Sequence, residues 1–245
     1  MTNQFSRTEL LLGKEAMKRL RASRVAVFGI GGVGGHVAEV LARSGVGAIA
    51  LIDPDSVSLS NLNRQLVALH STVGRLKVEV MAERIRDINP DCRVQTHALF
   101  YLPETADEID LAQFDYVVDC IDTVKAKLEL IRRCHRLQVP IICSMGAANK
   151  LDPTAFRVSD IAQTSMDPLA RVLRKKLRKE GIEHFQVVYS EEPPLHPVID
   201  DEETQREADA LAANGRRSLP ASCAFVPAAA GLVIGGEVVK RLAGE

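Results

Sequence analysis

Short strand-like runs, mostly apolar, alternate along the chain with segments whose apolar residues recur at helical spacing. Runs of this kind are typical of strands that are buried on both faces of a sheet. They lie at 25–29, 45–53, 92–98, 114–122 and 139–146. The segments with helical spacing predict helices at 8–21, 32–44, 76–89 and 126–138. Because strands and helices alternate, the pattern predicts an α/β fold with a doubly wound, mostly parallel sheet and flanking helices.

The pattern changes near residue 150, which divides the chain into a core, 1–150, and a C-terminal extension, 151–245, packed on the same domain. In the extension we expect a basic helix at about 165–180. The following stretch is rich in proline and then in acids, without an apolar period, and it predicts a mobile loop at about 193–218. Small residues dominate the last segment, "FVPAAAGLVIGGEVVKRLAG", which predicts a closely packed C-terminal helix.

Composition narrows the class of protein. The 245 residues are 46% hydrophobic and 26% charged, with a formal net charge of −1, so only a local basic patch would favour nucleic acid. Five scattered cysteines without a C-x-x-C pair argue against a disulfide framework or a zinc site and favour a cytoplasmic compartment. The charged N-terminus does not resemble a signal peptide, and no apolar run reaches the roughly 18 residues of a transmembrane segment.

A glycine-rich turn follows the first strand. Gly29, Gly31 and Gly34 form a G-x-G-x-x-G pattern that includes Gly32, and Asp53 ends the next strand. Glycines before a helix let backbone N–H groups approach a phosphate, and an acid about 20 residues later can accept ribose hydroxyls. The stretch therefore predicts a Rossmann-like nucleotide site, with a purely structural turn as the alternative. It does not specify NAD, because the loop contacts phosphate and ribose rather than nicotinamide.

The polar residues after the second strand favour a triphosphate. They are Asp55, Asn61, Arg64, Gln65 and Lys77. Arginine forks and lysine ammonium groups are suited to phosphate. Asp122 follows the fourth strand, and a carboxylate beside phosphates is unfavourable without a cation between them, which predicts Mg²⁺ at Asp122. The alternatives are that Arg64 and Lys77 are solvated surface charges and that Asp122 caps the next helix.

These motifs resemble the ubiquitin-activating, molybdopterin- and thiamine-synthesis adenylyltransferase superfamily over about residues 7 to 150. The stretches are "GIGGVGGHVAEVLARSGVGAIALIDPDSVSLSNLNRQ", "VGRLKVEVMAERIRDINP" and "VVDCIDT". The resemblance implies that the protein binds ATP and Mg²⁺ and adenylates a carboxylate. It implies that Gly29, Gly31, Gly32 and Gly34 line the phosphates, Asp53 holds the ribose, Asn61, Arg64 and Lys77 contact phosphates, and Asp122 carries the metal. Arg7 matches an arginine that reaches the partner subunit's ATP, which implies a homodimer with shared sites.

The second half resembles the tRNA threonylcarbamoyladenosine dehydratase branch, in "SMGAANKLDPTAFRVSDIAQTSMDPLARVLRKKLRKEGI" and "VVYSEEPP". This resemblance implies that ATP activates the carboxylate of the threonylcarbamoyl group on a tRNA adenosine. The activated carboxyl is then attacked within the same modification, closing a ring with net loss of water. An acyl-adenylate and an acyl-phosphate intermediate both stay open, as does a sulfur-relay protein partner. In the superfamily, asparagine usually follows the aspartate that carries the metal, but in this chain Thr123 follows Asp122.

A local basic cluster is a candidate surface for tRNA binding. It consists of Arg171, Arg174, Lys175, Lys176, Arg178 and Lys179. A solvated helix face is the commoner meaning of such a run, and the alternative stays open. Because the total charge is near zero, this cluster is nevertheless the best candidate for contact with phosphates of the tRNA backbone.

The proposed chemistry needs no protein nucleophile, because the attacking group is already tethered to the activated carboxyl. The catalytic task is electrostatic, and we assign it to Arg64, Lys77, Asp122 and the partner's Arg7. Cys223 is interpreted as a small buried residue rather than a thioester or persulfide cysteine.

The residues disfavour three other functions. An activating enzyme for a ubiquitin-like sulfur carrier is disfavoured by the missing zinc cysteines and by the basic helix. An NAD-dependent oxidoreductase is disfavoured by the set Asn61, Arg64, Lys77 and Asp122. The intact motif residues argue against a non-catalytic scaffold.

Overall fold

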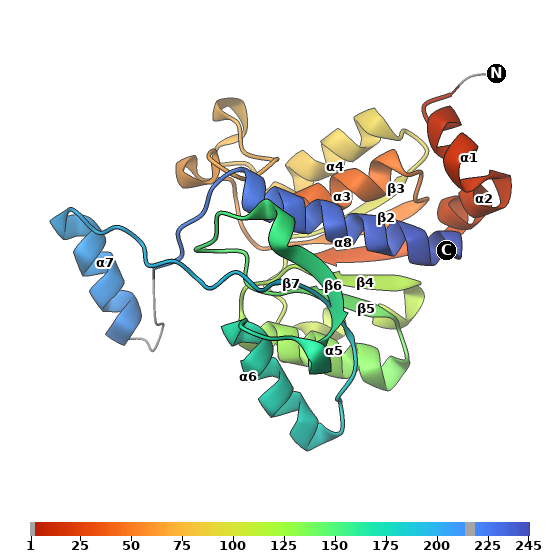
Figure 1. The fold of residues 1–245 in the computed structure, drawn as a ribbon. Coiled ribbons are helices and arrows are strands. Elements are labelled where there is room, and N and C mark those ends of the chain that lie inside the picture. Colours follow the sequence, from red (N-terminus) through yellow and green to blue (C-terminus); the bar gives the residue numbers. More distant parts are fainter. Residues whose placement is uncertain (1–2, 214–218) are drawn as a thin grey trace.

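The computed structural model describes residues 3–213 and 219–245, and a seven-stranded sheet forms its centre (Figure 1). The strand order is β3-β2-β1-β4-β5-β7-β6, and every neighbouring pair is parallel except the antiparallel pair of β6 and β7. The strands are β1 (Arg24–Phe28), β2 (Ala48–Ile52), β3 (Arg93–His97), β4 (Tyr116–Asp119), β5 (Ile141–Ser144), β6 (Phe156–Asp160) and β7 (Gln186–Ser190). The α/β class and the mostly parallel sheet are confirmed.

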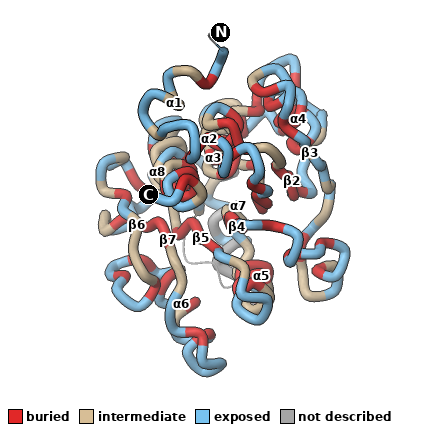
Figure 2. Tube along the Cα trace, turned by 90° about the vertical axis from the view of Figure 1, so that its right-hand side faces the viewer, coloured by how far each residue is buried: buried red, intermediate tan, exposed pale blue. Residues whose placement is uncertain are grey.

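Helices cover both faces of this sheet and define two apolar cores. Residues of α2, α3, α4 and α8 form the core on one face, and residues of α5 and α6 form the core on the other. Figure 2 shows buried residues along the central strands, between these two layers. The helices are α1 (Ser6–Leu12), α2 (Lys14–Ala22), α3 (Gly34–Arg43), α4 (Lys77–Ile88), α5 (Val124–Leu137), α6 (Pro168–Leu177), α7 (Glu202–Ala213) and α8 (Phe225–Ala243).

The order of the strands fixes where a ligand can bind. The chain leaves β1 toward β2 on one side, and β4 pairs with β1 on the other side. In open α/β sheets a crevice forms at this point, outside the carboxyl ends of the strands. The loops that follow β1, β2 and β4 therefore converge on one place.

The leading helix differs from the sequence prediction. We expected one helix at 8–21, but α1 and α2 are separated at Gly13, whose φ is +82°. A residue in this left-handed region ends a right-handed helix, and glycine adopts it without steric strain.

Small residues bring α8 into close contact with α3. A Cβ atom on Gly231 would lie 2.4 Å from the carbonyl oxygen of Val33, and one on Gly235 would lie 2.7 Å from the Cβ of Val40. The two helices can approach this closely only because these positions are glycines. The predicted C-terminal helix therefore packs against the helix that follows the glycine-rich turn.

Near the end of α8, a buried carboxylate pairs with two basic side chains of the same helix. Glu237 is 7% exposed and accepts from Lys240 at 2.6 Å and from Arg241 at 3.0 Å. Burial acts to raise the pKa of Glu237, but its hydrogen bonds to the two basic side chains outweigh burial and hold that pKa below its ordinary value.

The extension completes the sheet of the core rather than forming a second one, because β6 and β7 add to the edge at β5. The prediction of a loop over 193–218 is wrong for its central part, where α7 forms. Asp201 begins this helix by accepting from the backbone N–H of Thr204 at 2.8 Å and from its hydroxyl at 2.6 Å. The segment lacks an apolar period because α7 lies apart from the sheet (Figure 1). The last residues of that predicted loop, 214–218, lie outside the described residues.

Within residues 3–213 and 219–245, the structure contains no helix with both the length and the apolar character that crossing a membrane requires.

Candidate active site

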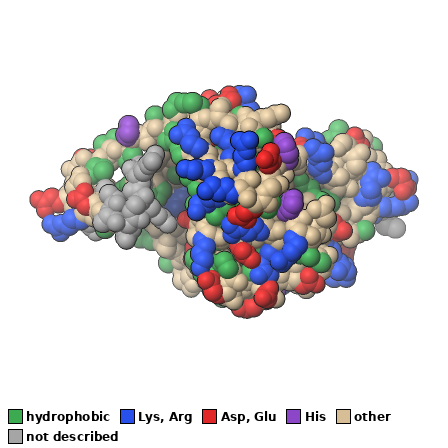
Figure 3. Space-filling model, turned by 90° about the horizontal axis from the view of Figure 1, so that it is seen from below, with side chains coloured by type: hydrophobic (Ala, Val, Ile, Leu, Met, Phe, Trp, Pro, Cys, Tyr) green, Lys and Arg blue, Asp and Glu red, His purple; other side chains and the backbone are tan. Residues whose placement is uncertain are grey.

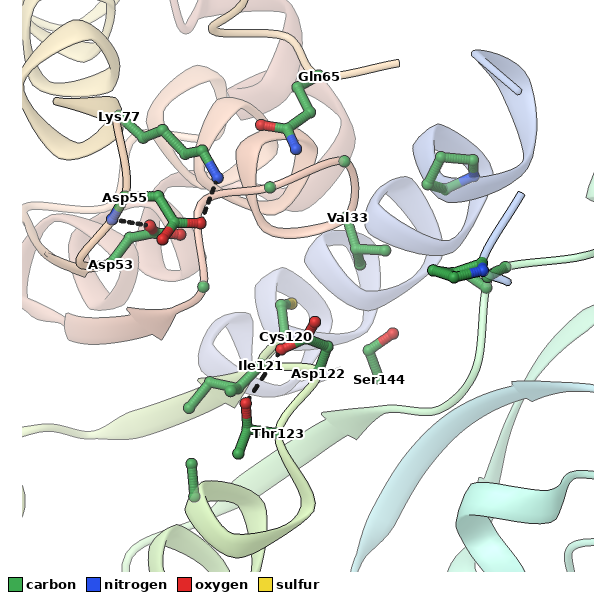
Figure 4. Close-up of a pocket in the computed structure, with 18 of the residues that line it drawn as sticks. Val33, Asp53, Asp55, Gln65, Lys77, Cys120, Ile121, Asp122, Thr123 and Ser144 are labelled. Atoms are coloured by element: carbon green, nitrogen blue, oxygen red, sulfur yellow. Dashed lines mark hydrogen bonds and ion pairs between the residues drawn. The ribbon is translucent and has the colours of Figure 1, made fainter. Parts of the chain in front are cut away.

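A cleft of about 560 Å³ lies at the carboxyl ends of β1, β2, β4 and β5. Its lining includes ten of the residues that the sequence assigned to a nucleotide site. They are Gly29, Gly31, Gly32, Asp53, Asp55, Asn61, Arg64, Gln65, Lys77 and Asp122. Figure 4 shows Asp53, Asp55 and Lys77 on one side of the cleft, with Asp122, Thr123 and Ser144 across from them. The cleft therefore has two sides that different strands supply.

The glycines of the turn have different structural tasks. Gly29 has a φ of +86°, and a Cβ there would lie 2.7 Å from the carbonyl oxygen of Cys120. At Gly31 the nearest atom to such a Cβ is the Gln65 amide nitrogen at 3.7 Å, so this residue leaves the cleft floor open. Gly34 begins α3 and does not line the cleft; its Cβ would lie 1.8 Å from the carbonyl oxygen of Gly29. Gly34 is thus needed for packing of helix on strand, not for the lining that we expected.

Asp53 links the end of β2 to the glycine-rich turn. It is 5% exposed, and its Oδ2 accepts from the backbone N–H of Ile30 at 2.6 Å. Its Oδ1 accepts from the backbone N–H of Asp55 at 2.8 Å. Burial raises the pKa of Asp53, while Lys77 and the two N–H groups act in the opposite direction. Each carboxylate oxygen has a second lone pair, so Asp53 can shape the turn and still accept a hydroxyl hydrogen bond.

Lys77 is the first residue of α4, and its side chain is only 6% exposed. Its ammonium donates to Oδ2 of Asp55 at 2.8 Å, and the Asp55 side chain is 60% exposed. A buried stem that ends in a cleft holds the positive charge in place, whereas an exposed carboxylate is a partner that an incoming anion can replace. The alternative of a solvated surface charge is therefore wrong for Lys77.

The polar loop after β2 offers both donors and acceptors. Arg64 donates from one nitrogen to the carbonyl oxygen of Ser60 at 2.9 Å and to Asn63 Oδ1 at 2.8 Å. Asn61 Oδ1 accepts from the backbone N–H of Ser58 at 3.2 Å. Among the described residues, Gln65 Oε1 is buried and has no hydrogen-bond partner. A buried acceptor without a partner is costly, so Gln65 Oε1 is available to a hydrogen-bond donor on a ligand in the cleft.

Asp122 is exposed, and its Oδ1 accepts from the hydroxyl of Thr123 at 3.2 Å. Thr123 occupies the N-cap position of α5, without a capping hydrogen bond from its side chain, so Asp122 is not the helix cap that we considered as its alternative role. No group of three or more histidine, cysteine or acidic side chains suited to a metal occurs in the described part of the chain. A divalent cation at Asp122 would accordingly take its other ligands from phosphate oxygens and water, as Mg²⁺ commonly does.

The sequence analysis missed a buried ion pair beneath the cleft. Lys127 Nζ lies 3.0 Å from Asp119 Oδ2 and donates to the carbonyl oxygen of Ser144 at 2.8 Å. The two side chains are 1% and 0% exposed. Burial opposes the charge of Lys127, but the Asp119 carboxylate outweighs burial and raises the pKa of Lys127. Asp119 also accepts from the backbone N–H of Ile121 at 3.1 Å, so the pair ties α5 to the ends of β4 and β5.

Arg7 does not line the cleft of its own chain; it lies exposed on α1. Cys223 is half-buried just before α8, with its sulfur 4.0 Å from the carbonyl oxygen of Lys150. Burial raises the pKa of the other cysteine thiols, to about 11 at Cys92 and about 12 at Cys120 and Cys134. These thiols are therefore protonated at neutral pH, whereas Cys223 is less buried than the sequence analysis predicts.

The basic cluster covers α6 and the turn after it, on the face shown in Figure 3. Arg174 differs from its neighbours, because its guanidinium donates to the hydroxyl of Thr164 and to two backbone carbonyl oxygens, of Ile161 and Thr164. Lys175 and Lys176 are exposed, as are Arg171, Arg178 and Lys179. Arg174 thus anchors α6, and the other five side chains reach solvent.

The fold and the cleft define a nucleotide-binding α/β protein, in which one cleft is lined by a glycine-rich turn, by the acid that follows β2 and by the basic side chains of Arg64 and Lys77. A sequence profile of the ThiF family matches residues 5–245, and the chain belongs to this family. It is 49% identical to a tRNA threonylcarbamoyladenosine dehydratase of Bacillus subtilis (strain 168), over 99% of this chain and 95% of that protein. It is 42% identical to the protein of the same name from Escherichia coli (strain K12), over 80% of this chain and 76% of the relative.

Solved structures show the same fold. The crystal structure of the E. coli tRNA N6-threonylcarbamoyladenosine dehydratase in complex with ATP matches with a TM-score of 0.85 and 36% identity. The match covers 98% of this chain and 94% of the other. A complex of that protein with AMP matches with a TM-score of 0.86. The family resemblance that the sequence suggested is confirmed.

Proposed function

We propose that this protein uses ATP to dehydrate threonylcarbamoyladenosine in tRNA, closing a ring by activating the carboxylate of the modification. The observation that carries the proposal is a cleft with nucleotide-binding groups, in a chain that is similar from end to end to dehydratases of that name. ATP as the cosubstrate is supported by the ATP and AMP complexes of a relative with the same fold.

The proposed reaction consists of two successive displacement steps. The carboxylate oxygen of the modification attacks a phosphorus atom of ATP, and pyrophosphate or ADP leaves, depending on which phosphorus is attacked. A nucleophile of the same modification then attacks the activated carbonyl carbon, and AMP or phosphate leaves with the former carboxylate oxygen. The ring closes, and the tRNA has lost the elements of water. Because the nucleophile is tethered, proximity supplies much of the rate.

The residues of the cleft would divide this task. Asp53 would accept ribose hydroxyls, and the open floor at Gly31 would admit the phosphates. Lys77 and Arg64 would stabilise the charge that develops on the phosphates, with Asn61 as a neutral partner. Lys77 would exchange its contact with Asp55 for a phosphate oxygen.

We place Mg²⁺ at Asp122, the exposed carboxylate across the cleft from Lys77. Bound there, the cation would offset phosphate charge. We also propose a homodimer in which Arg7 reaches the partner's site, since it lies outside its own. A sulfur-relay partner remains a prediction. A tRNA substrate agrees with the cytoplasmic location that the sequence predicts.

The tRNA backbone would bind the exposed basic side chains of α6 and its following turn. These are Arg171, Lys175, Lys176, Arg178 and Lys179. We exclude Arg174 from the proposed tRNA contacts, because its guanidinium donates to the carbonyl oxygens of Ile161 and Thr164. The contact would be electrostatic, so it weakens as salt concentration rises.

The test is nucleoside mass spectrometry of tRNA that carries threonylcarbamoyladenosine, after incubation with the protein, ATP and Mg²⁺. The proposal expects that nucleoside to lose the mass of one water, and expects no loss without ATP or with Lys77→Met. The matched control Lys125→Met, whose exposed lysine lies outside the cleft, should stay active. An unchanged nucleoside, with ATP consumed only when a ubiquitin-like carrier protein is added, would instead indicate activation of a protein C-terminus.

A further inference from the structure

The cleft has a second wall that differs in chemistry from the wall formed by Asp53, Asp55 and Lys77. It consists of 145–148, Leu169, Pro220 and Ser222, which we call the neutral wall. None of these side chains carries a charge. Gly146, Ala147 and Ala148 are small, so the wall leaves space beside it. A wall of small and apolar side chains can pack against a flat, uncharged group.

Hydrogen bonds hold the segments of the neutral wall together. Asn149 pairs with Ala221 through two hydrogen bonds, in which its Oδ1 accepts at 2.7 Å and its N–H donates at 2.8 Å. Its amide also donates to the carbonyl oxygen of Leu219 at 3.2 Å. Asp167, which is 3% exposed, accepts from the N–H of Gly146 at 3.2 Å and from that of Ala170 at 2.8 Å. The wall is therefore formed in advance by residues of three distant parts of the chain.

The neutral wall meets the charged side of the cleft at a defined contact. The amide of Asn63, beside Arg64, donates to the carbonyl oxygen of Ser222 at 3.0 Å. The loop that would contact phosphates is thus attached to the segment that forms the neutral wall. A group resting on this wall would have its reactive end next to the phosphates.

One helix connects the neutral wall to the basic cluster. Leu169 lines the cleft from the first turn of α6, and Lys175 and Lys176 are exposed near its end. An α-helix rises 1.5 Å per residue, so these lysines lie about 10 Å along the axis from the wall. At this distance they can bind the backbone phosphates beside a nucleotide whose base lies in the cleft.

We propose that the neutral wall is the subsite for the modified base of the tRNA, which enters the cleft out of its stack with its carboxylate aimed at the ATP phosphates. This inference rests on the proposed function and adds where the second substrate binds. Enzymes that act on a base commonly extrude it into a pocket lined by apolar side chains, while the backbone stays on a basic surface. The small side chains at 146–148 determine how much modification the cleft admits.

The experiment enlarges one of these side chains and measures ATP binding and turnover of the modified tRNA separately. Ala148→Leu and the smaller step Ala148→Val narrow the neutral wall, and Ala162→Leu, at an exposed position outside the cleft, is the control. We expect Ala148→Leu to bind ATP and unmodified tRNA like the wild type. We expect Ala148→Leu to lower kcat/KM for the modified tRNA about tenfold or more. Ala148→Val should give a smaller loss, and Ala162→Leu should leave kcat/KM unchanged.

The outcomes separate this inference from the proposed function. Equal losses of ATP affinity and of kcat/KM would assign the neutral wall to the nucleotide and overturn the inference. Unchanged kcat/KM in both Ala148 variants would also overturn it. A wild-type protein that binds ATP but leaves the modified nucleoside intact would remove the proposed function, and the inference with it.

Discussion

Removal of the buried Lys127 ammonium is the most informative perturbation of the fold beneath the cleft. In Lys127→Met the Asp119 carboxylate remains, 0% exposed, without the cation 3.0 Å away. Breaking one half of a buried ion pair typically costs about 3–5 kcal/mol, because it leaves an uncompensated charge. In a domain of this size that corresponds to a melting temperature lower by roughly 6–20 °C.

The assay is urea unfolding at neutral pH, with Lys125→Met as the matched control on the same helix. Lys125 pairs with Glu104 on the surface, where both side chains are more than half exposed, so its loss should cost about 0–1 kcal/mol. The double variant Lys127→Met/Asp119→Asn removes the stranded charge and should recover part of the loss. Because the folded pKa of Lys127 is raised, the pair stabilises the protein below the ordinary lysine pKa of 10.5 and loses this effect at higher pH.

Two results would refute this reasoning. One is a loss of stability in Lys127→Met no larger than in Lys125→Met. The other is a double variant no more stable than Lys127→Met alone, which would show that the stranded Asp119 charge is not the cause.

Three further predictions concern α8 and α6. Gly231→Ala places a Cβ atom 2.4 Å from a carbonyl oxygen at the start of α3 and should lose about 1–3 kcal/mol in urea unfolding. In the control Gly236→Ala the added Cβ atom would have no neighbour within 4 Å, so the free energy of unfolding should rise by about 0.5–1 kcal/mol. Equal effects of the two substitutions would contradict the packing argument. Glu237→Gln should lose about 1 kcal/mol at neutral pH; since the folded pKa of Glu237 is lowered from 4.5, this difference should vanish as pH falls below that value. Lys175→Glu/Lys176→Glu should weaken tRNA binding and leave ATP binding unchanged, and equal tRNA affinity at moderate salt would exclude α6 as the binding surface.

The sequence predicts that the glycine-rich turn and the acid after β2 lie together, because these residues are close to one another in the chain. Gly29, Gly31 and Asp53 follow two consecutive strands, and strand ends of a parallel sheet meet at one edge. The role of Gly34 could not be separated from theirs, since only the backbone geometry shows that its Cβ would strike the carbonyl oxygen of Gly29.

Other features depend on contacts between distant residues. In the sequence, Lys127 cannot be distinguished from the surface charges of a helix that is rich in basic residues. Its burial becomes evident only when the structure shows Asp119 beside it. The neutral wall combines residues near 146, 169 and 221, and no spacing in the sequence brings these together. Helix α7 lies apart from the sheet, and its sequence has no clear apolar period, so its pattern cannot be distinguished from that of a loop.

The central claim is that ATP activates the carboxylate of the substrate, and an isotope label tests it most directly. The carboxylate of the tRNA modification is labelled with a heavy oxygen isotope, and the products are examined by mass spectrometry after one turnover with ATP. Activation predicts that one labelled oxygen appears in AMP or in phosphate, according to the intermediate. Ring closure with the label released only into water, and none in AMP or phosphate, would contradict the account.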